Sequence, residues 1–117
     1  MGTPLRIEST MEGEETAVLS LIGEVDVANA GQVKEAALKL VSDGAKRLVV
    51  NLNGTEYMDS SGLGILVGLL KRLKESGGQM ALAAARPRVK RLFEITGLTQ
   101  VFALCEDVAA ALKEVRG

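Results

Sequence analysis

An apolar strand that runs into a long amphipathic helix occupies the middle of the chain and constrains its fold more than any other segment. Residues 48–52 form a nearly continuous apolar run with β-branched side chains, which predicts a short buried strand. A polar loop begins at Asn53, and from Ser60 apolar residues recur at helical spacing until Gly77. Because a strand followed directly by a helix is the repeating unit of α/β folds, we expect a layered α/β domain.

The same alternation of strand and helix patterns continues on both sides of this unit. Asn29 and Gln32 have the spacing of a capping box at a helix start, and Pro87 suits the first turn of another helix. Gly44 and Gly97 are typical helix stops. The expected elements begin with an antiparallel pair of strands at 5–8 and 16–22 joined by an acidic turn, an irregular segment at 23–28 and a helix from Asn29 to Gly44. The central strand, at 47–52, and the helix from Ser60 follow. After them come a strand at 79–84, a helix from Pro87 to Gly97, a short strand at 101–104 and a last helix after Glu106 and Asp107.

Length and element order together predict one domain that covers residues 1–117. A chain of 117 residues buries roughly 65% of its unfolded surface, which is enough for an independent core. We therefore expect an α/β fold with a mixed sheet of four to five strands and about four helices. Neighbouring strands should be parallel wherever a helix lies between them in the chain.

The start of the central helix carries Asp59-Ser60-Ser61-Gly62 and has two interpretations. Helix starts leave backbone N–H groups unpaired, and Asp or Ser side chains accept hydrogen bonds from them, so the simpler interpretation is a helix cap. The same N–H groups and the positive end of the helix dipole also favour a phosphate. In the second interpretation a serine hydroxyl at this position is a phosphorylation site.

Two glycines lie one turn apart within the central helix and away from its apolar face. Gly64 and Gly68 fall beside Arg72 and Glu75, although each glycine costs a helix roughly 1 kcal/mol relative to alanine. Either a partner approaches the helix closely there, or the glycines serve local packing. The residues expected on the core face are Leu63, Leu66, Val67, Leu70 and Leu73.

Charge and composition favour a protein partner. The net charge of −1 gives no general attraction to nucleic acid or to anionic membranes, and 3% aromatic residues leave few platforms for base stacking. No charged segment followed by an apolar one opens the chain, and no apolar run approaches the ~18 residues of a membrane span. We expect a cytoplasmic protein that contacts neither nucleic acid nor membrane directly.

The residues for common enzyme chemistry are missing from the sequence. There is no histidine to act as a base, and Ser60 does not lie in a Gly-x-Ser-x-Gly turn. A dinucleotide-binding glycine pattern starting at Gly62 fails because Val67 stands where the third glycine is needed. Cys105 is the only cysteine, which leaves no thiolate cluster for a metal. The prediction is a protein without catalytic residues, metal or cofactor.

Three segments in the same order resemble the STAS family, and in particular its bacterial members that act as anti-sigma factor antagonists. Residues 57–64, Tyr-Met-Asp-Ser-Ser-Gly-Leu-Gly, look like the signature of these antagonists, and Gly23-Glu24-Val25-Asp26 resembles their earlier Gly-Glu-apolar-Asp element. Residues 87–93 with Gly97-Leu98 resemble their third helix and the turn after it. Together the three segments cover most of the chain. The likeness is greatest to the sporulation antagonists that control sigma-F.

This resemblance implies a regulatory switch. In that family the first serine of the signature is phosphorylated by a partner that is both anti-sigma factor and serine kinase, which by match points to Ser60. The unphosphorylated form binds that partner and releases the sigma factor, and a separate serine phosphatase reverses the modification. The residues expected at the partner surface are Asp26, Asp59, Ser61, Gly62, Gly64 and Gly68. A basic cluster at residues 86–91 is either the solvated side of a helix or a contact at the rim of that surface. The alternative function is a scaffold or ligand-sensing module of a signalling assembly that binds a nucleotide.

Overall fold

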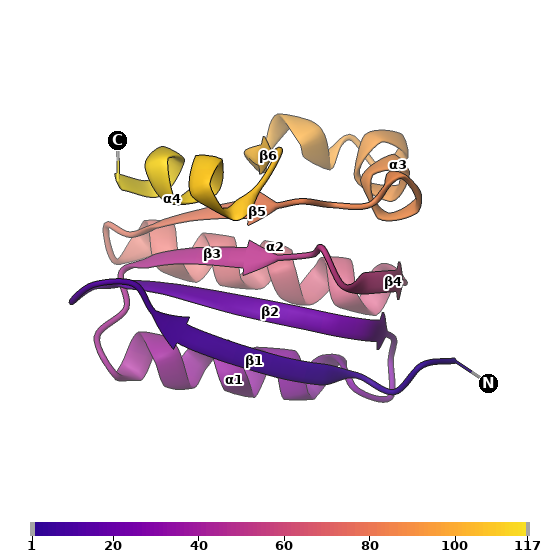
Figure 1. Ribbon diagram of the computed structural model, residues 1–117, viewed down its shortest axis with the longest axis horizontal. Helices are drawn as coiled ribbons and strands as arrows, with labels where there is room; N and C mark the ends of the chain where they lie inside the picture. Colours follow the sequence, from indigo (N-terminus) through magenta and orange to yellow (C-terminus); the bar gives the residue numbers. More distant parts are fainter. Residues whose placement is uncertain (1, 117) are drawn as a thin grey trace.

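A mixed sheet of six strands runs through the protein with helices on both faces (Figure 1). The computed structural model describes residues 2–116, so the two end residues of the expected domain lie outside the described part. The elements in chain order are β1 (Arg6–Met11), β2 (Thr16–Val25), α1 (Ala30–Ser42), β3 (Arg47–Asn51), β4 (Thr55–Met58), α2 (Ser60–Glu75), β5 (Gln79–Ala83), α3 (Pro87–Ile95), a 3-10 turn (Leu98–Gln100), β6 (Leu104–Cys105) and α4 (Val108–Arg116).

The strand order in the sheet is β1-β2-β3-β5-β6, and β4 pairs separately with β2. The pair of β1 and β2 is antiparallel, as the acidic turn between them predicts, and the other pairs are parallel. Helices α1 and α2 lie on one face of the sheet, and α4 lies on the other face across β3 and β5 (Figure 1). The prediction of an α/β fold with a mixed sheet and four helices is therefore confirmed.

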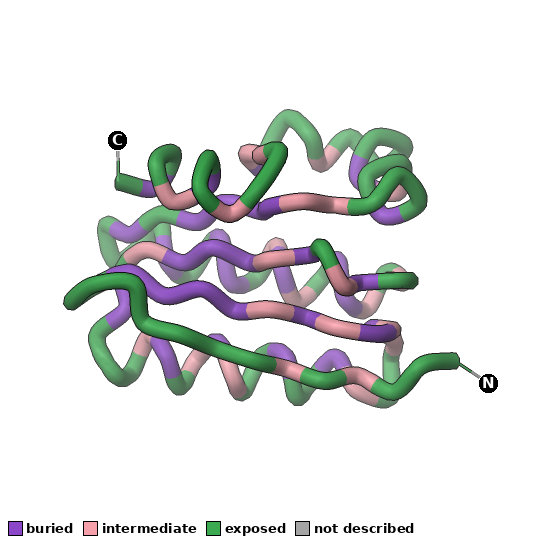
Figure 2. Tube along the Cα trace, in the orientation of Figure 1, coloured by how far each residue is buried: buried purple, intermediate pink, exposed green. Residues whose placement is uncertain are grey.

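The alternation of side chains along the strands divides the core between the two faces of the sheet. Central strands are buried along most of their length, whereas β1 is largely exposed (Figure 2). The side chains toward α1 and α2 form the larger cluster, which includes Leu19, Leu21, Leu48, Val50, Leu66 and Leu82. Those toward α4 form a smaller cluster of Val18, Val49, Ala81, Ala83, Ala111 and Val115. Small residues on the α4 side let this short helix lie close to the sheet.

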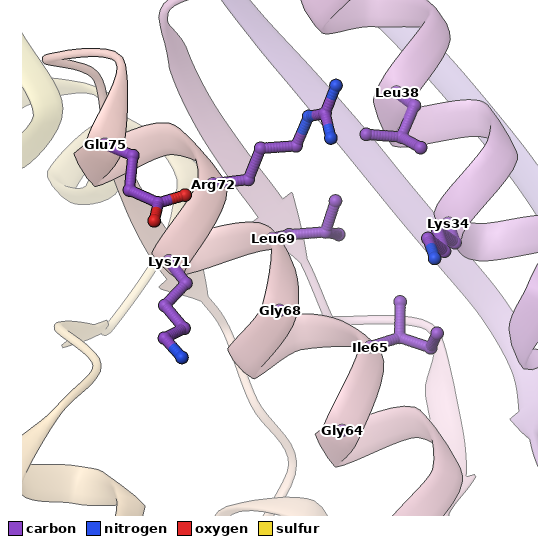
Figure 3. A pocket seen from close by; sticks show the side chains of 9 residues that line it. All are labelled: Lys34, Leu38, Gly64, Ile65, Gly68, Leu69, Lys71, Arg72 and Glu75. Carbon is purple, nitrogen blue, oxygen red and sulfur yellow. The ribbon is translucent and has the colours of Figure 1, made fainter.

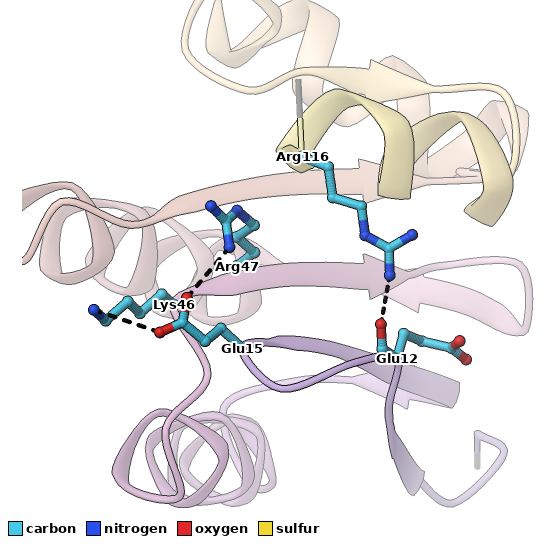
Figure 4. Close-up of polar contacts among 5 residues, drawn as sticks. All are labelled: Glu12, Glu15, Lys46, Arg47 and Arg116. Atoms are coloured by element: carbon cyan, nitrogen blue, oxygen red, sulfur yellow. Dashed lines mark hydrogen bonds and ion pairs between the residues drawn. The ribbon is translucent and has the colours of Figure 1, made fainter.

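Polar contacts hold together the end of the sheet at which β2 and β3 begin (Figure 4). The carboxylate of Glu15 lies 3.6 Å from the ammonium group of Lys46 and 3.6 Å from the guanidinium group of Arg47. Arg116, in the last turn of α4, donates to the backbone carbonyl of Glu12 in the β1–β2 turn. Because these groups are exposed, each ion pair contributes at most about 1 kcal/mol to the stability.

Five details of the sequence prediction are wrong. The short strand expected at 101–104 lies at Leu104–Cys105, because the 3-10 turn at Leu98–Gln100 continues into a bend before it. The expected irregular segment at 23–28 begins as strand, because β2 continues to Val25. The loop expected before α2 contains β4, which the sequence pattern did not indicate. Asn29 makes no side-chain bond to the start of α1, so the capping box does not form. On the core face of α2, Leu69 is buried and Val67 is only half-buried, because α1 packs beside α2 and widens the covered arc.

Thr55 fastens β4 to β2 through its side chain. Its hydroxyl is fully buried and donates a hydrogen bond of 2.6 Å to the backbone carbonyl of Leu21. The backbone N–H of Gly23 donates to the carbonyl of Gly54 just before β4. These two bonds fix where β4 begins, and hence where α2 begins.

We predict that Thr55→Val lowers the free energy of unfolding by about 1–3 kcal/mol, because the buried Leu21 carbonyl loses a donor while the shape of the side chain is kept. Urea denaturation measures the change. Thr10→Val makes the same chemical change on exposed β1 and should stay within about 0.5 kcal/mol of wild type. Equal effects of the two substitutions would show that the Thr55 hydroxyl does not hold β4.

Candidate functional site

The carboxyl ends of β2 and β4 lie side by side and bring the two predicted motifs together. Val25 pairs with Met58 in the parallel ladder, and the N–H of Asp59 donates to the carbonyl of Val25 at 3.1 Å. Asp26 and Asp59 therefore leave the sheet at neighbouring positions. Segments that are 33 positions apart in the chain form one surface, at the edge where α/β folds commonly place their sites.

Asp59 is the N-cap of α2. Its Oδ1 accepts hydrogen bonds from the N–H of Ser61 at 2.8 Å and from the N–H of Gly62 at 3.3 Å. The capping interpretation is thus confirmed for Asp59, and the carboxylate occupies two of the N–H groups that a helix start leaves free. Ser60 is the first residue of the helix and is exposed, while Ser61 is half-buried.

Asp26 shapes the loop between β2 and α1. Its Oδ1 accepts from the N–H of Ala28 at 2.9 Å and from the N–H of Asn29 at 3.3 Å. The Asn29 side chain accepts from the N–H of Asp26 at 2.9 Å and donates to the carbonyl of Glu24 at 2.9 Å. This closed set of bonds fixes the loop and leaves Val27 with 79% of its surface exposed at the tip. The loop thus presents an exposed apolar side chain.

Gly62 shapes the site from inside the protein. It is buried, and a Cβ atom there would lie 2.6 Å from Cγ of Met58 and 2.9 Å from Cγ1 of Val25. Because only glycine allows α2 to begin this close to the two strand ends, the structure gives Gly62 a packing role. A partner surface at α2 would be formed by its exposed neighbours instead.

Gly64 and Gly68 line an open groove between α1 and α2, which we call the α1–α2 groove (Figure 3). Both glycines are exposed, and a Cβ atom at either would meet no atom of another part of the protein within 4 Å in the described residues. Local packing therefore does not explain them. The cavity has a volume of about 350 Å³ and is lined by Lys34, Leu38, Gly64, Ile65, Gly68, Leu69, Lys71, Arg72 and Glu75.

One member of the basic cluster has a structural contact that sequence patterns did not reveal. The Nε of Arg86 donates to the backbone carbonyl of Asn53 at 2.7 Å, which ties the start of α3 to the loop before β4. Arg88, Lys90 and Arg91 are exposed on α3. Arg86 thus supports the segment that leads to Ser60, whereas the other three lie on the solvated side of the helix.

The single cysteine does not have the properties of a reactive thiol. Cys105 is half-buried in β6, and burial raises the pKa of its thiol, with a further increase from the carboxylates of Glu114 and Asp107. A raised pKa keeps the thiol protonated near neutral pH, and the thiolate is the nucleophilic form. Cys105 is therefore a structural residue of the sheet edge.

A comparison with protein-family models matches residues 9–111 to the STAS domain. The match covers most of the described residues, including the strand ends and the whole of α2. The chain belongs to the STAS domain family, as the three sequence segments indicate.

Several proteins similar to this chain are named as anti-sigma factor antagonists. The anti-sigma-B factor antagonist of Staphylococcus aureus is 38% identical over 94 residues, which cover 80% of this chain and 86% of that protein. A crystal structure of an anti-sigma factor antagonist from Mycobacterium paratuberculosis is 28% identical with a TM-score of 0.83, covering 97% of this chain and 94% of the other. The structure of the anti-sigma factor antagonist SpoIIAA in its unphosphorylated form is 26% identical with a TM-score of 0.81, covering 97% of both chains. Both sigma-B antagonists and SpoIIAA lie among the matches.

The helices of the described part are short relative to a lipid bilayer. None of those in residues 2–116 is both long and apolar enough to cross a membrane.

The different surroundings of the helix glycines give a direct test of their roles. We predict that Gly62→Ala destabilises the protein by about 1–2 kcal/mol, because the added methyl group overlaps Met58 and Val25. Gly68→Ala, in the same helix, should stabilise it by up to about 1 kcal/mol, since the new methyl group meets open space and alanine favours the helix. Thermal and urea denaturation of the two variants give both values. A destabilised Gly68→Ala would mean that Gly68 has an internal role.

Proposed function

We propose that the protein is a non-enzymatic anti-sigma factor antagonist that is switched by phosphorylation of Ser60. The unphosphorylated form binds an anti-sigma factor with serine kinase activity, and the sigma factor is released. Phosphorylation ends this complex, and a serine phosphatase restores the binding form. Similar proteins of the STAS family are anti-sigma factor antagonists, and one of them, SpoIIAA, has been solved in a form named as unphosphorylated.

The placement of Ser60 is the observation that carries this proposal. Ser60 is exposed at the first position of α2, whereas the neighbouring Ser61 is half-buried and its N–H is bound to Asp59. A kinase can therefore reach the Ser60 hydroxyl without opening the fold. Asp26, Asp59 and Ser61 form the surface around it, and Gly64 and Gly68 extend that surface along α2.

The surroundings of Ser60 explain how a phosphate would act. A phosphoserine adds about −1.5 to −2 charges at pH 7. The Asp59 carboxylate already holds the N–H groups of Ser61 and Gly62, so the phosphate is left to project outward beside that carboxylate. A partner that covers this surface would have to desolvate the dianion, at a cost of several kcal/mol. A cost of about 3 kcal/mol already lowers affinity more than a hundredfold.

The experiment is to incubate the protein with its cognate anti-sigma factor kinase and with ATP, and to measure its mass. We expect one phosphate on wild type and none on Ser60→Ala. In binding assays, Ser60→Ala should bind the kinase constitutively, and Ser60→Asp should bind it at least about a hundredfold more weakly.

The matched control is Ser61→Ala, which leaves Ser60 in place and should still accept the phosphate. Ser60→Asp should melt close to wild type, because attraction to the helix dipole and repulsion from Asp59 are each about 1 kcal/mol or less and oppose one another. The switch would be contradicted if Ser61→Ala accepted the phosphate but phosphorylated and unphosphorylated wild type bound the kinase equally tightly. A grossly unfolded Ser60→Asp would contradict the electrostatic block.

A further inference from the structure

The α1–α2 groove combines a positive rim with an apolar floor. Leu38, Ile65 and Leu69 form the floor, and of these only Leu69 is fully covered by the protein. Three basic residues, Lys34, Lys71 and Arg72, line the groove, against one acidic residue, Glu75. The groove is therefore positive on a protein whose formal net charge is −1. This local excess of positive charge favours an acidic occupant.

The three basic side chains of the groove are available for a partner. Within residues 2–116, none of them lies within 4.0 Å of a carboxylate, whereas Lys39 on the outer side of α1 pairs with Asp43. In Figure 3 the Arg72 side chain extends toward α1 and Leu38, and Lys71 extends away from α1. Because the cationic groups do not converge on one point, they suit carboxylates spread along an extended ligand better than a single phosphate group.

The shape of the groove suits a helix. It follows α2 from Gly64 to Glu75, a length of about 17 Å or three helical turns. Gly64 and Gly68 remove side chains from its wall and would let a neighbouring backbone approach closely. Partly exposed apolar residues on α1 and α2 can contact a partner helix that lies in the groove. In an amphipathic helix the apolar residues that make such contacts recur at i, i+3 or i+4 and i+7.

We propose that the α1–α2 groove binds an acidic amphipathic helix of a protein partner. This inference rests on the proposed function, because it describes the segment of the partner protein that covers Gly64 and Gly68. The apolar stripe of that helix packs on the partly exposed Leu38 and Ile65, above the buried Leu69. Its acidic residues face Lys34 and Arg72 toward α1 and Lys71 on the side away from α1.

Distance separates this contact from the phosphorylation site. Arg72 lies twelve positions after Ser60 on α2, which is about 18 Å along the helix axis. Charges in solvent are largely screened beyond about 8 Å at physiological salt. The attraction between Arg72 and an acidic partner is therefore insensitive to the phosphate, which acts on the part of the partner surface near Ser60.

The test uses two synthetic helical peptides of about 12–16 residues, long enough to span the groove. One carries leucines at i, i+3 and i+7 flanked by glutamates, and the other has lysine at each glutamate position. We expect the glutamate peptide to bind at least about tenfold more tightly, and to weaken as salt rises from about 50 to about 500 mM. Amide chemical shifts should change at Leu38, Ile65 and Leu69.

Variants of the protein locate the binding surface. Arg72→Glu and Lys34→Glu should each weaken binding of the glutamate peptide at least about tenfold, whereas Lys113→Glu on α4 leaves it unchanged. Gly68→Leu fills the groove and should block the peptide while the protein stays folded. Ser60→Asp should bind the peptide within about twofold of wild type, because of screening.

Several results would overturn the groove proposal. These are equal affinity for the two peptides, no effect of Arg72→Glu, shift changes confined to another surface, displacement of the peptide by inorganic phosphate at equal ionic strength, or a dimer of the free protein that Gly68→Leu abolishes. The mass measurement on Ser60 uses no peptide. Failure of the switch and failure of the groove are therefore seen in separate experiments.

Discussion

Along the edge that does not face β1, strand β2 pairs first with β3 and then with β4, and the site depends on this succession. Its first half pairs with β3 from Thr16 to Ser20, and its last residues, from Gly23 to Val25, pair with β4. Within the pairing with β4 the register shifts after Gly23. Gly23 has a φ of +106°, which favours glycine, and a Cβ atom there would lie 2.3 Å from the carbonyl oxygen of Pro4. Because the end of β2 pairs with β4, Asp26 and Asp59 leave the sheet at neighbouring positions.

At the start of α2, buried residues determine the structure and an exposed residue forms the candidate site. Thr55, Met58 and Gly62 are buried and determine where α2 begins, while Asp59 closes its first turn. Ser60 is held at the surface by its neighbours and carries none of the packing. Modification of such a residue changes the charge of a surface without loosening the core beneath it.

Sequence patterns were sufficient where local rules decide the structure. The capping residue Asp59, the helix from Ser60 to the glycines after it, and the alternation of strands and helices all follow from spacing and composition. Sequence patterns failed at β4 because its four residues, Thr55–Met58, are too few to show a pattern. The strand forms by pairing with residues of β2 that lie more than 30 positions earlier in the chain. The capping box predicted at Asn29 was wrong for a related reason. The Asn29 side chain forms hydrogen bonds with the backbone before α1, at Glu24 and Asp26, and not with the start of the helix. For Gly64 and Gly68 the sequence left two explanations, and only the open space around them excluded packing.

The exposure of Ser60 on a rigid first helical turn has a kinetic consequence. Many modified serines lie in segments that must open locally before an enzyme can reach them, and the opening equilibrium then limits the rate. Here the hydroxyl is accessible in the ground state of the fold, so hydrogen-exchange protection of α2 and the modification rate should be uncoupled. In the proposed switch, the response time is therefore set by how often the protein meets its kinase and phosphatase, and so by the concentrations of these enzymes.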